Sequence, residues 1–545
     1  MEFNYGDIFD AVLALPPQDQ PALIEVGGER TRTWGELQSR TNRLARALLE
    51  RGISPGDKLA IYMENRLEYV EAVVALLKAR LVHVNINFRY RAEELLHVVD
   101  HSDAAVVVFD TPRAPELAAI RGQLAKVRLF VEVGEEGETS LEGAEAFETL
   151  AGTGDDGPLA ITRSGDDLWF LYTGGTTGKP KAVMIKQDVL FRVQGQNSIF
   201  AVYPKPPADL AEHLERAREH LRMGRRGLVS APMMHAVGLY TTLFPLSYGV
   251  SVVVMRGGHF DAQAVLNAVD RFRVIRIAIV GDAMANPLVQ ALQAHRERWD
   301  LSSLEAVTSS GMALSRDNKI ALIRLLPQLT VSDGLGASES PGMGYHVLTK
   351  DNVADQGEVR MSLPPSCRIF SADFSREVVP GSGEKGLFAR SGLLAEGYYK
   401  DPEGTARTFP VINGVRYVVV GDWAEVLADG SVRFLGRGAL CINTGGEKVY
   451  VEEVEEAIKR HPGVRDVAVV SVPDPRWGQA VTAVVELRAG YALDAESIRH
   501  QVRQLLASYK APKHVVQTSQ VARLATGKTD YAANRSFALA YLSLN

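Results

Sequence analysis

One stretch constrains this chain more than any other: residues 168–187 read Leu-Trp-Phe-Leu-Tyr-Thr-Gly-Gly-Thr-Thr-Gly-Lys-Pro-Lys-Ala-Val-Met-Ile-Lys-Gln. The apolar runs Leu168–Tyr172 and Ala182–Ile185 are typical of buried strands. Between them, Thr173–Lys181 holds three glycines, three threonines and two lysines. Glycines allow tight turns and expose backbone N–H groups, while threonine hydroxyls and lysine ammonium groups add donors and charge. The stretch therefore predicts a strand–loop–strand unit that binds phosphate.

This loop does not match the common P-loop, in which Gly, four residues, Gly-Lys and Ser or Thr open a helix. Gly178 follows Gly174 one residue too soon, and Pro180 stands where the hydroxyl residue should be. Because the residue before a proline avoids the helical region, we expect the chain to return to a strand after Lys179. A plain glycine-rich surface turn is the alternative, and the density of hydroxyls and lysines argues against it.

The pattern along the rest of the chain predicts an α/β protein of more than one domain. The chain has 545 residues, too many for one compact core. Strand-like and helix-like segments alternate, which predicts doubly wound parallel sheets in a large N-terminal domain, residues 1–436. Short strands and turns from about 352 to 436 predict a small β-rich subdomain. Residues 437–545 predict a smaller, mobile α+β C-terminal domain, with a hinge near 437–442.

Two polar segments interrupt this alternation. Residues 133–167 are rich in Gly, Glu, Asp and Thr, which predicts a mobile surface segment ahead of the loop. A charged stretch at 204–226 predicts a helix that carries His213 and His220. Their spacing matches none of the zinc-protease helical patterns, so we expect both histidines on a solvated helix face.

Composition narrows the classes of function. Net charge is −6, so no broad basic surface is expected and a nucleic-acid-binding protein is disfavoured. The two cysteines, Cys367 and Cys441, lie far apart without metal-ligand neighbours and suit a reducing compartment. No apolar run approaches the length of a transmembrane segment. We therefore expect a cytoplasmic protein, and the sequence leaves peripheral membrane contact and a homodimer open.

The loop closely resembles the phosphate-binding signature of the adenylate-forming enzymes, which include acyl-CoA synthetases, luciferases and the adenylation domains of peptide synthetases. That signature is Tyr-Thr-Ser/Gly-Gly-Thr-Thr-Gly-x-Pro-Lys-Gly, and Thr173–Lys181 follows it, with Ala182 in place of the last glycine. The resemblance covers essentially the whole chain. Further segments resemble family motifs in the family's order: residues 231–238, 310–315, 334–339, 417–422, 436–450 and 523–531.

This resemblance implies catalytic and metal-binding residues. Lys528 would bridge the substrate carboxylate and the α-phosphate of ATP, and His235 would lie where the acyl and adenylate sites meet. Glu339 would hold Mg²⁺ with the nucleotide phosphates, helped by the Thr173 hydroxyl, since Mg²⁺ prefers hard oxygen ligands. The implied catalytic residues are thus Lys528, His235 and Glu339.

The resemblance also implies a nucleotide site. Asp422 would accept hydrogen bonds from both ribose hydroxyls, and Arg437 would contact ribose or phosphate. Leu335 stands where the family usually has an aromatic residue that stacks on adenine, so adenine would be held by aliphatic contact. The implied ATP-binding residues are Thr173, Gly174, Gly175, Thr176, Thr177, Gly178, Lys179, Lys181, Ser310, Gly311, Asp333, Gly334, Leu335, Gly336, Ala337, Ser338, Asp422, Arg437 and Lys528.

The acyl and coenzyme A sites follow from the same resemblance. The implied acyl-pocket residues are Val237, Ala283, Met312 and Met343, which are small or apolar and favour a bulky hydrophobic acyl group. Gly445 and Gly446 would line the tunnel for the pantetheine arm of coenzyme A, and Lys510 would also bind coenzyme A.

The resemblance implies a reaction in two steps. A carboxylate attacks the α-phosphate of ATP and pyrophosphate leaves; the small domain then rotates, and the thiol of coenzyme A attacks the acyl-adenylate with loss of AMP. Several segments resemble the branch that activates fatty acids and steroid side-chain carboxylates, which implies an ATP-dependent, Mg²⁺-dependent acyl-CoA ligase for such an acid. Three alternatives stay open: loading of a separate carrier protein, a light-emitting oxidation, and a non-catalytic nucleotide-binding relative.

Overall fold

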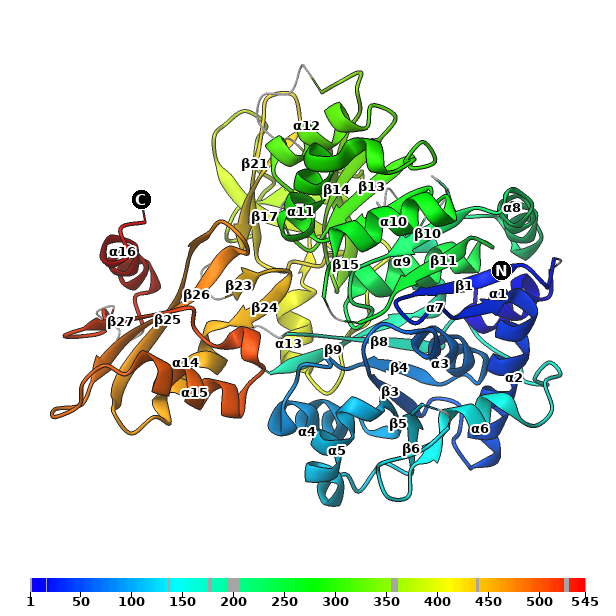
Figure 1. Ribbon diagram of the computed structural model, residues 1–545. Helices are drawn as coiled ribbons and strands as arrows, with labels where there is room; N and C mark the ends of the chain where they lie inside the picture. The colour runs from blue at the N-terminus through cyan, green and yellow to red at the C-terminus, as the bar shows by residue number, and fades with distance from the viewer. Residues whose placement is uncertain are drawn as a thin grey trace.

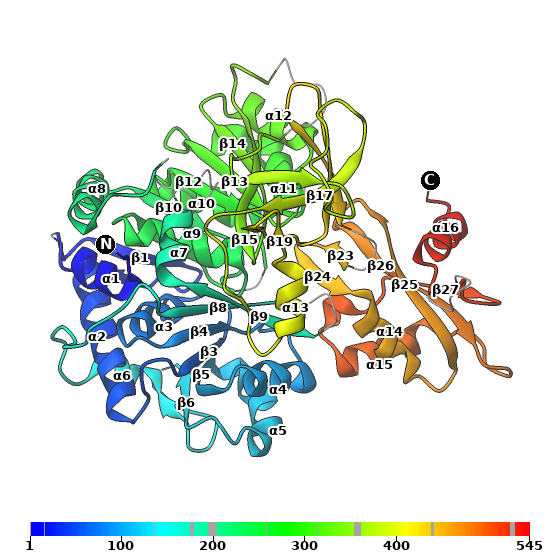
Figure 2. The same ribbon diagram turned by 180° about the vertical axis from the view of Figure 1, so that it is seen from behind.

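The computed structural model describes residues 2–15, 17–135, 137–174, 179–194, 203, 205–257, 259–312, 314–353, 361–437, 441–523 and 529–544. In this part of the chain, a large N-terminal body carries a smaller C-terminal domain on one side (Figure 1). The two meet near strands β23 (Cys441–Thr444) and β24 (Glu447–Tyr450). Seen from behind in Figure 2, the last helix, α16 (Tyr531–Tyr541), lies on the outer side of the C-terminal domain.

A five-stranded sheet formed by residues between 58 and 146 is parallel and has helices on both faces. Its strand order is β4-β3-β5-β6-β7, and all described pairings are parallel. The elements are α2 Trp34–Glu50, β3 Lys58–Tyr62, α3 Leu67–Lys78, β4 Val82–Asn85, α4 Ala92–His101, β5 Ala104–Asp110, α5 Ala114–Ile120, β6 Leu129–Val133 and β7 Glu145–Ala146. In β3, Leu59 and Ile61 face the core that contains α2 and α3, while Ala60 and Tyr62 face the one that contains α4 and α5. The prediction of a doubly wound sheet is confirmed.

A second, larger sheet brings together strands from distant parts of the chain. Among the described residues its order is β15-β14-β13-β12-β10-β11-β1-β2, with antiparallel strands only at the two edges. The strands are β1 Pro21–Val26, β2 Thr31–Thr33, β10 Arg226–Val229, β11 Ser251–Met255, β12 Arg276–Ile279, β13 Ala306–Ser310, β14 Thr330–Ala337 and β15 Ser340–Leu348. The helices beside them are α1 Tyr5–Leu13, α9 Ala236–Ser247, α10 Ala262–Phe272, α11 Gly281–His295 and α12 Arg316–Leu325. The parallel neighbours β13 and β14 have their carboxyl ends at the same edge of the sheet. Ligands of α/β proteins commonly bind at this edge.

The predicted strand–loop–strand unit is confirmed. Strand β8 (Leu168–Gly174) pairs antiparallel with β9 (Pro180–Lys186), and Thr173 lies opposite Lys181. The chain thus returns to a strand at Pro180, as the proline predicted. Residues 175–178, at the tip of the hairpin, lie outside the described part. A short strand, β18 (Gly397–Tyr398), adds to β9.

The later part of the chain forms a β-rich subdomain and the C-terminal domain. The former has an antiparallel sheet of β16 Cys367–Phe370, β17 Lys385–Arg390, β21 Asp422–Val426 and β22 Val432–Arg437, with α13 Pro402–Thr408 and the small pair β19 Val411–Ile412 and β20 Val415–Arg416 nearby. The latter contains β23, β24, α14 Val451–Lys459, β25 Val464–Asp474, β26 Gly478–Leu487, α15 Ala495–Leu505, β27 His514–Thr518 and α16. Its main apolar core holds residues from Ile442 onward. The boundary at 436/437 stays a prediction.

Two expectations for the polar segments are wrong. Within 133–167, Phe147–Gly152 forms helix α6, whose Phe147 is fully buried. Helix α8 (Leu210–Met223) carries His213 and His220, which are 0% and 7% exposed rather than solvated. Aromatic rings that follow and precede α8 in the chain cover both: Tyr248 lies 4.3 Å from His213 and Tyr203 5.4 Å from His220, between ring centroids.

Candidate active site

A large cavity of about 1570 Å³ lies between the N-terminal body and the C-terminal domain. It begins at the carboxyl ends of β13 and β14 and reaches β8 and the β23–β24 turn. Most of the predicted site residues meet on its wall: Thr173, His235, Val237, Ala283, Ser310, Gly311, Met312, Asp333, Gly334, Leu335, Gly336, Ala337, Ser338, Asp422, Gly445, Gly446 and Lys510. The fold thus gathers segments that are far apart in the sequence around one space.

Other predicted residues lie off this wall. Lys179 is exposed, and Lys181 pairs with Asp401 beside the hairpin. Met343 is fully buried in the core of the β-rich subdomain, with Cys367 and Phe388, and so faces away from the cavity. Gly174 is the last residue of strand β8. The predicted residues outside the described part of the chain are Gly175, Thr176, Thr177, Gly178 and Lys528, together with the side chain of Arg437.

A buried charge network stands behind the carboxyl end of β14. The Asp333 carboxylate, 2.9 Å from the Lys319 ammonium of α12, lies opposite His346 of β15. Lys319 is fully buried and Asp333 is 6% exposed. Burial raises the pKa of Asp333 above its ordinary value, and the Lys319 charge acts in the opposite direction. The network fixes a carboxyl group at the edge of the cavity, where it can accept a hydrogen bond from a bound molecule.

A second polar cluster lies beside the hairpin of β8 and β9. The Tyr398 hydroxyl donates to Glu339 at 2.6 Å, and the Lys181 ammonium lies 5.5 Å above the Tyr398 ring. Lys181 donates to Asp401 at 2.6 Å and holds the pKa of that carboxyl below its ordinary range. Glu339 offers the hard oxygen donor that Mg²⁺ prefers. Within the described residues, no group of three or more His, Cys, Asp or Glu side chains is arranged to hold a metal ion.

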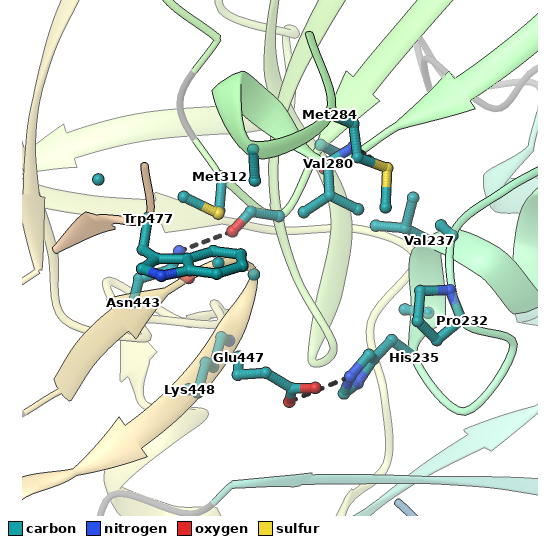
Figure 3. Close-up of a pocket in the computed structure, with 18 of the residues that line it drawn as sticks. Pro232, His235, Val237, Val280, Met284, Met312, Asn443, Glu447, Lys448 and Trp477 are labelled. Carbon is teal, nitrogen blue, oxygen red and sulfur yellow. Dashed lines mark hydrogen bonds and ion pairs between the residues drawn. The ribbon is translucent and has the colours of Figure 1, made fainter. Parts of the chain in front are cut away.

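Apolar side chains form another wall of the cavity. Figure 3 shows Val237, Val280, Met284 and Met312 around it, with Asn443 and Trp477 approaching from the C-terminal domain. The Asn443 amide donates to the Gly311 carbonyl at 2.7 Å, which ties the two parts together. This wall suits a hydrophobic group.

The turn between β23 and β24 approaches this wall with bare backbone. Gly446 has φ of +87°, and a Cβ atom there would lie 2.6 Å from Val280 Cγ1. Gly445 has φ of +61°, and its Cβ would lie 2.7 Å from Trp477 Cε3. Positive φ and close approach both require glycine at these positions.

Immediately after this turn, Glu447 reaches across to the N-terminal body. Its Oε2 lies 3.2 Å from Nε2 of His235, as Figure 3 shows, and its other oxygen pairs with Arg89. The Asn87 amide donates to Oε2 at 3.3 Å. Burial of Glu447 raises its pKa, but His235 and Arg89 outweigh this and hold the pKa below its ordinary range. Glu447 is therefore an anion, 8% exposed, at the junction of the two parts.

Lys510 lies on the cavity wall, but its charge is engaged. Its ammonium donates to Glu94 of α4 at 2.6 Å and to Glu453 of α14 at 2.8 Å. The backbone N–H of Ala507 donates to the same Glu94 at 2.8 Å. Burial raises the pKa of Glu453 to about 7. In this arrangement Lys510 joins the C-terminal domain to the N-terminal body, and its predicted contact with coenzyme A stays a prediction.

The residues that flank the predicted catalytic lysine lie elsewhere on the C-terminal domain. Arg523 and Thr529 bridge to each other, and the Arg523 guanidinium binds Asp466 of β25 at 2.5 Å. None of these three residues lines the cavity. The domain therefore turns its glycine pair toward the cavity, while Arg523 and Thr529 lie outside the cavity.

Sequence reasoning missed several residues of this site. Glu447 lies in the motif segment 436–450 but was given no role there, and Arg89, Asn87 and Lys319 belong to no local pattern, because each gains its role from a partner in another element. Trp477 was the one with a local signal, a tryptophan beside a glycine in a turn of the C-terminal domain.

Two family models match the chain. The model described as AMP-binding enzyme matches residues 9–399, and that of the AMP-binding enzyme C-terminal domain matches 453–528. In the described residues, no helix combines the length and the apolar character that crossing a membrane requires.

Similar proteins support the same grouping. The "Medium/long-chain-fatty-acid--CoA/3-oxocholest-4-en-26-oate--CoA ligase" of Mycobacterium marinum is 36% identical over 536 residues, which cover 97% of this chain and 95% of the relative. The 3-oxocholest-4-en-26-oate--CoA ligase of Rhodococcus rhodochrous is 36% identical over 539 residues, with coverage of 97% and 95%. The structure of the amide bond synthetase McbA from Marinactinospora thermotolerans matches with a TM-score of 0.81 at 24% identity, covering 98% of this chain and 99% of that one. At that identity the likeness shows the fold alone.

Proposed function

Because the chain belongs to the AMP-binding enzyme family, we propose that it is an ATP-dependent acyl-CoA ligase for a hydrophobic carboxylic acid. One observation supports this proposal most strongly: described nucleotide-site residues, an apolar wall and the glycine turn of the C-terminal domain all line a single cavity. The names of the two relatives favour a fatty acid or a steroid side-chain acid as substrate. We also propose a cytoplasmic location, which the two free cysteines suit.

The first half-reaction forms the acyl-adenylate. An oxygen of the acid attacks the α-phosphorus of ATP, and the bond to pyrophosphate breaks. Negative charge gathers at the phosphorus, so positioning and charge neutralisation dominate the catalysis. The loop of Thr173–Lys181 would hold the β- and γ-phosphates, and Lys528 would bridge the two reacting groups. Glu339 and the Thr173 hydroxyl would hold Mg²⁺, which neutralises phosphate charge when bound.

Asp333 and Asp422 would hold the nucleoside. Adenine presents an amino group as a donor where guanine presents an acceptor oxygen, so a fixed carboxylate favours adenine. Asp333, kept in place by Lys319 on the cavity wall, would accept that hydrogen bond. Asp422 lies at the start of β21 on the cavity wall and would accept from the ribose hydroxyls. Aliphatic contact with Leu335 would replace the aromatic stacking that other members of the family use.

The second half-reaction forms the thioester. The thiolate of coenzyme A attacks the acyl carbon, and the bond to the phosphate oxygen of AMP breaks. The glycine turn supports this assignment, since Gly445 and Gly446 present backbone without side chains to the cavity, where a thin chain such as pantetheine would pass. The apolar wall of Val237, Ala283 and Met312 would bind the acyl group.

A direct assay tests this proposal. Purified protein is mixed with ATP, Mg²⁺, coenzyme A and a panel of medium-chain, long-chain, branched and steroid side-chain acids, and both AMP and thioester are measured. We expect acid-dependent AMP and thioester in equal amounts. AMP without thioester would point to another acceptor, such as a carrier protein. If no acid in the panel drives pyrophosphate release, the proposal is wrong.

A further inference from the structure

His235 and Glu447 come from different parts of the molecule, and the domain arrangement brings them together. His235 immediately precedes helix α9 of the N-terminal body, and Glu447 begins β24 of the C-terminal domain. We propose that Glu447 is a positioning residue that makes His235 the acceptor of the coenzyme A thiol proton, and does so only in this domain arrangement. The inference rests on the proposed ligase function and deepens its second half-reaction.

The geometry of the pair favours this role. Both side chains line the cavity, and Figure 3 shows them pointing toward one another below the apolar wall. His235 is held by its backbone: its N–H donates to Pro232 at 3.1 Å, and its carbonyl accepts from Leu239 at 3.0 Å. Its Nε2 faces Glu447 at 3.2 Å. In the arrangement we infer, the carboxylate beside Nε2 favours the proton of a neutral ring on that nitrogen, which leaves Nδ1 as the basic nitrogen.

The surrounding charges keep Glu447 ionised. Arg89 pairs with one of its oxygens, and Asn87, itself bonded to the Tyr509 hydroxyl, donates to the other. Lys510 adds a further positive charge at longer range and is itself balanced by Glu94 and Glu453. A carboxylate fixed in this way stabilises the imidazolium that forms when His235 accepts a proton.

The chemistry of the thiol creates the need for such a pair. A free thiol has a pKa of about 8.5, so most of it is protonated near neutral pH, yet the thiolate is the nucleophile. In the step we infer, the S–H proton moves to Nδ1 of His235 and the sulfur forms its bond to the acyl carbon. The carbon–oxygen bond to AMP breaks, and AMP leaves with the electron pair. The imidazolium later loses its proton to solvent.

The position of Glu447 in the chain determines at which stage of the reaction it can contact His235. It directly follows the glycine pair, so the turn that opens a path for the thiol also delivers the carboxylate. When the domain rotates to bring Lys528 to the cavity, this turn must leave, and His235 loses its partner. The activated base would therefore exist only when a thiol can arrive, which limits attack by water on the acyl-adenylate.

Two half-reactions measured separately test this inference. Adenylation is followed as exchange of pyrophosphate into ATP, and thioester formation as a single turnover of acyl-adenylate with coenzyme A between pH 5.5 and 9. For Glu447→Gln we expect thioester formation at pH 7 to fall by about 10²-fold, the lower end of general-base catalysis. The loss should be at least tenfold larger than any loss in adenylation.

The pH profile separates positioning from a merely structural effect. The residual rate of Glu447→Gln should follow ionisation of the thiol itself, and an acidic thiol analogue should recover most of the loss. Glu447→Asp should retain part of the rate. Glu456→Gln, an exposed glutamate of α14, is the matched control and should behave as wild type.

The results that would overturn the inference are distinct from failure of the ligase proposal. If Glu447→Gln slows both half-reactions equally, or keeps the wild-type pH profile, Glu447 does not position a base. If wild-type protein shows no acid-dependent adenylation, the ligase function is wrong and the inference falls with it. Normal adenylation with an unchanged thioester profile overturns the inference alone.

Discussion

The glycine turn at the cavity allows a sharp test of the domain arrangement. In Gly446→Ala, the new Cβ would lie 2.6 Å from Val280 Cγ1, well inside normal contact. The positive φ of +87° adds a further cost of about 1–2 kcal/mol, but that cost is the same wherever the C-terminal domain stands. The clash with Val280 exists only in the arrangement described here. Overpacking of this kind costs about 1–3 kcal/mol.

The free-energy cost of the clash predicts a change in the rate of thioester formation. At about 1.4 kcal/mol per factor of ten, the clash should lower the population of this arrangement by roughly 5- to 150-fold. We therefore expect thioester formation from supplied acyl-adenylate to fall by that factor in single-turnover assays. Adenylation, which uses the other arrangement in the proposed mechanism, should change far less.

A second substitution identifies the cause. Val280→Ala removes the atom that the new methyl group would meet, so the double variant should recover most of the lost thioester rate, as a double-mutant cycle measures. Gly430→Ala, at a turn with φ of +81° and no neighbouring atom within 4 Å, controls for the backbone cost alone. If Val280→Ala restores nothing, or if both half-reactions fall together, the clash reasoning is refuted.

Three further predictions concern the charge networks and the buried histidines. Glu94→Gln should weaken the interdomain contact with Lys510 and slow thioester formation several-fold. Glu93→Gln is the control and should have little effect in the same assay, because the Arg460 and Glu93 side chains of that ion pair are 48% and 65% exposed. Lys319→Met should leave Asp333 without the ammonium group that pairs with it. The preference for ATP over GTP in pyrophosphate exchange should then fall by about tenfold, the effect expected from losing one hydrogen bond to the base. Burial lowers the pKa of each α8 histidine to about 4. The unfolded chain therefore binds more protons between pH 6.5 and 4, so stability should be full above pH 6.5 and fall by up to about 3 kcal/mol per histidine as pH drops to 4, measured by urea unfolding.

The sequence predicted the fold best where the structure depends on residues that are close together in the chain. The hairpin of β8 and β9 follows from two apolar runs and from Pro180, which bars a helix. The alternation of strand-like and helix-like segments identified the doubly wound sheet, since helices that connect parallel strands cover both faces of the sheet. These features depend on neighbours within a few positions.

The residues that sequence reasoning missed depend on distant partners. Glu447 is defined by Asn87, which lies 360 positions away, and by Arg89, 358 positions away. The α8 histidines looked solvated because their spacing says nothing about the tyrosine rings that other segments lay over them. No local periodicity contains such information, so only the folded chain could supply it.

The junction between the two parts of the molecule contains several charged pairs, and such pairs suit the domain rotation that the proposed mechanism requires. Its described contacts include the Glu447 pairs with His235 and Arg89, the Lys510 pair with Glu94, and the hydrogen bond from the Asn443 amide to Gly311. An apolar junction of the same extent would expose its surface to water on every rotation, at about 25 cal/mol for each Å². Charged groups regain hydration when they separate, which offsets much of the lost attraction. The same contacts can therefore fix one arrangement well enough for chemistry and still release it in each catalytic cycle.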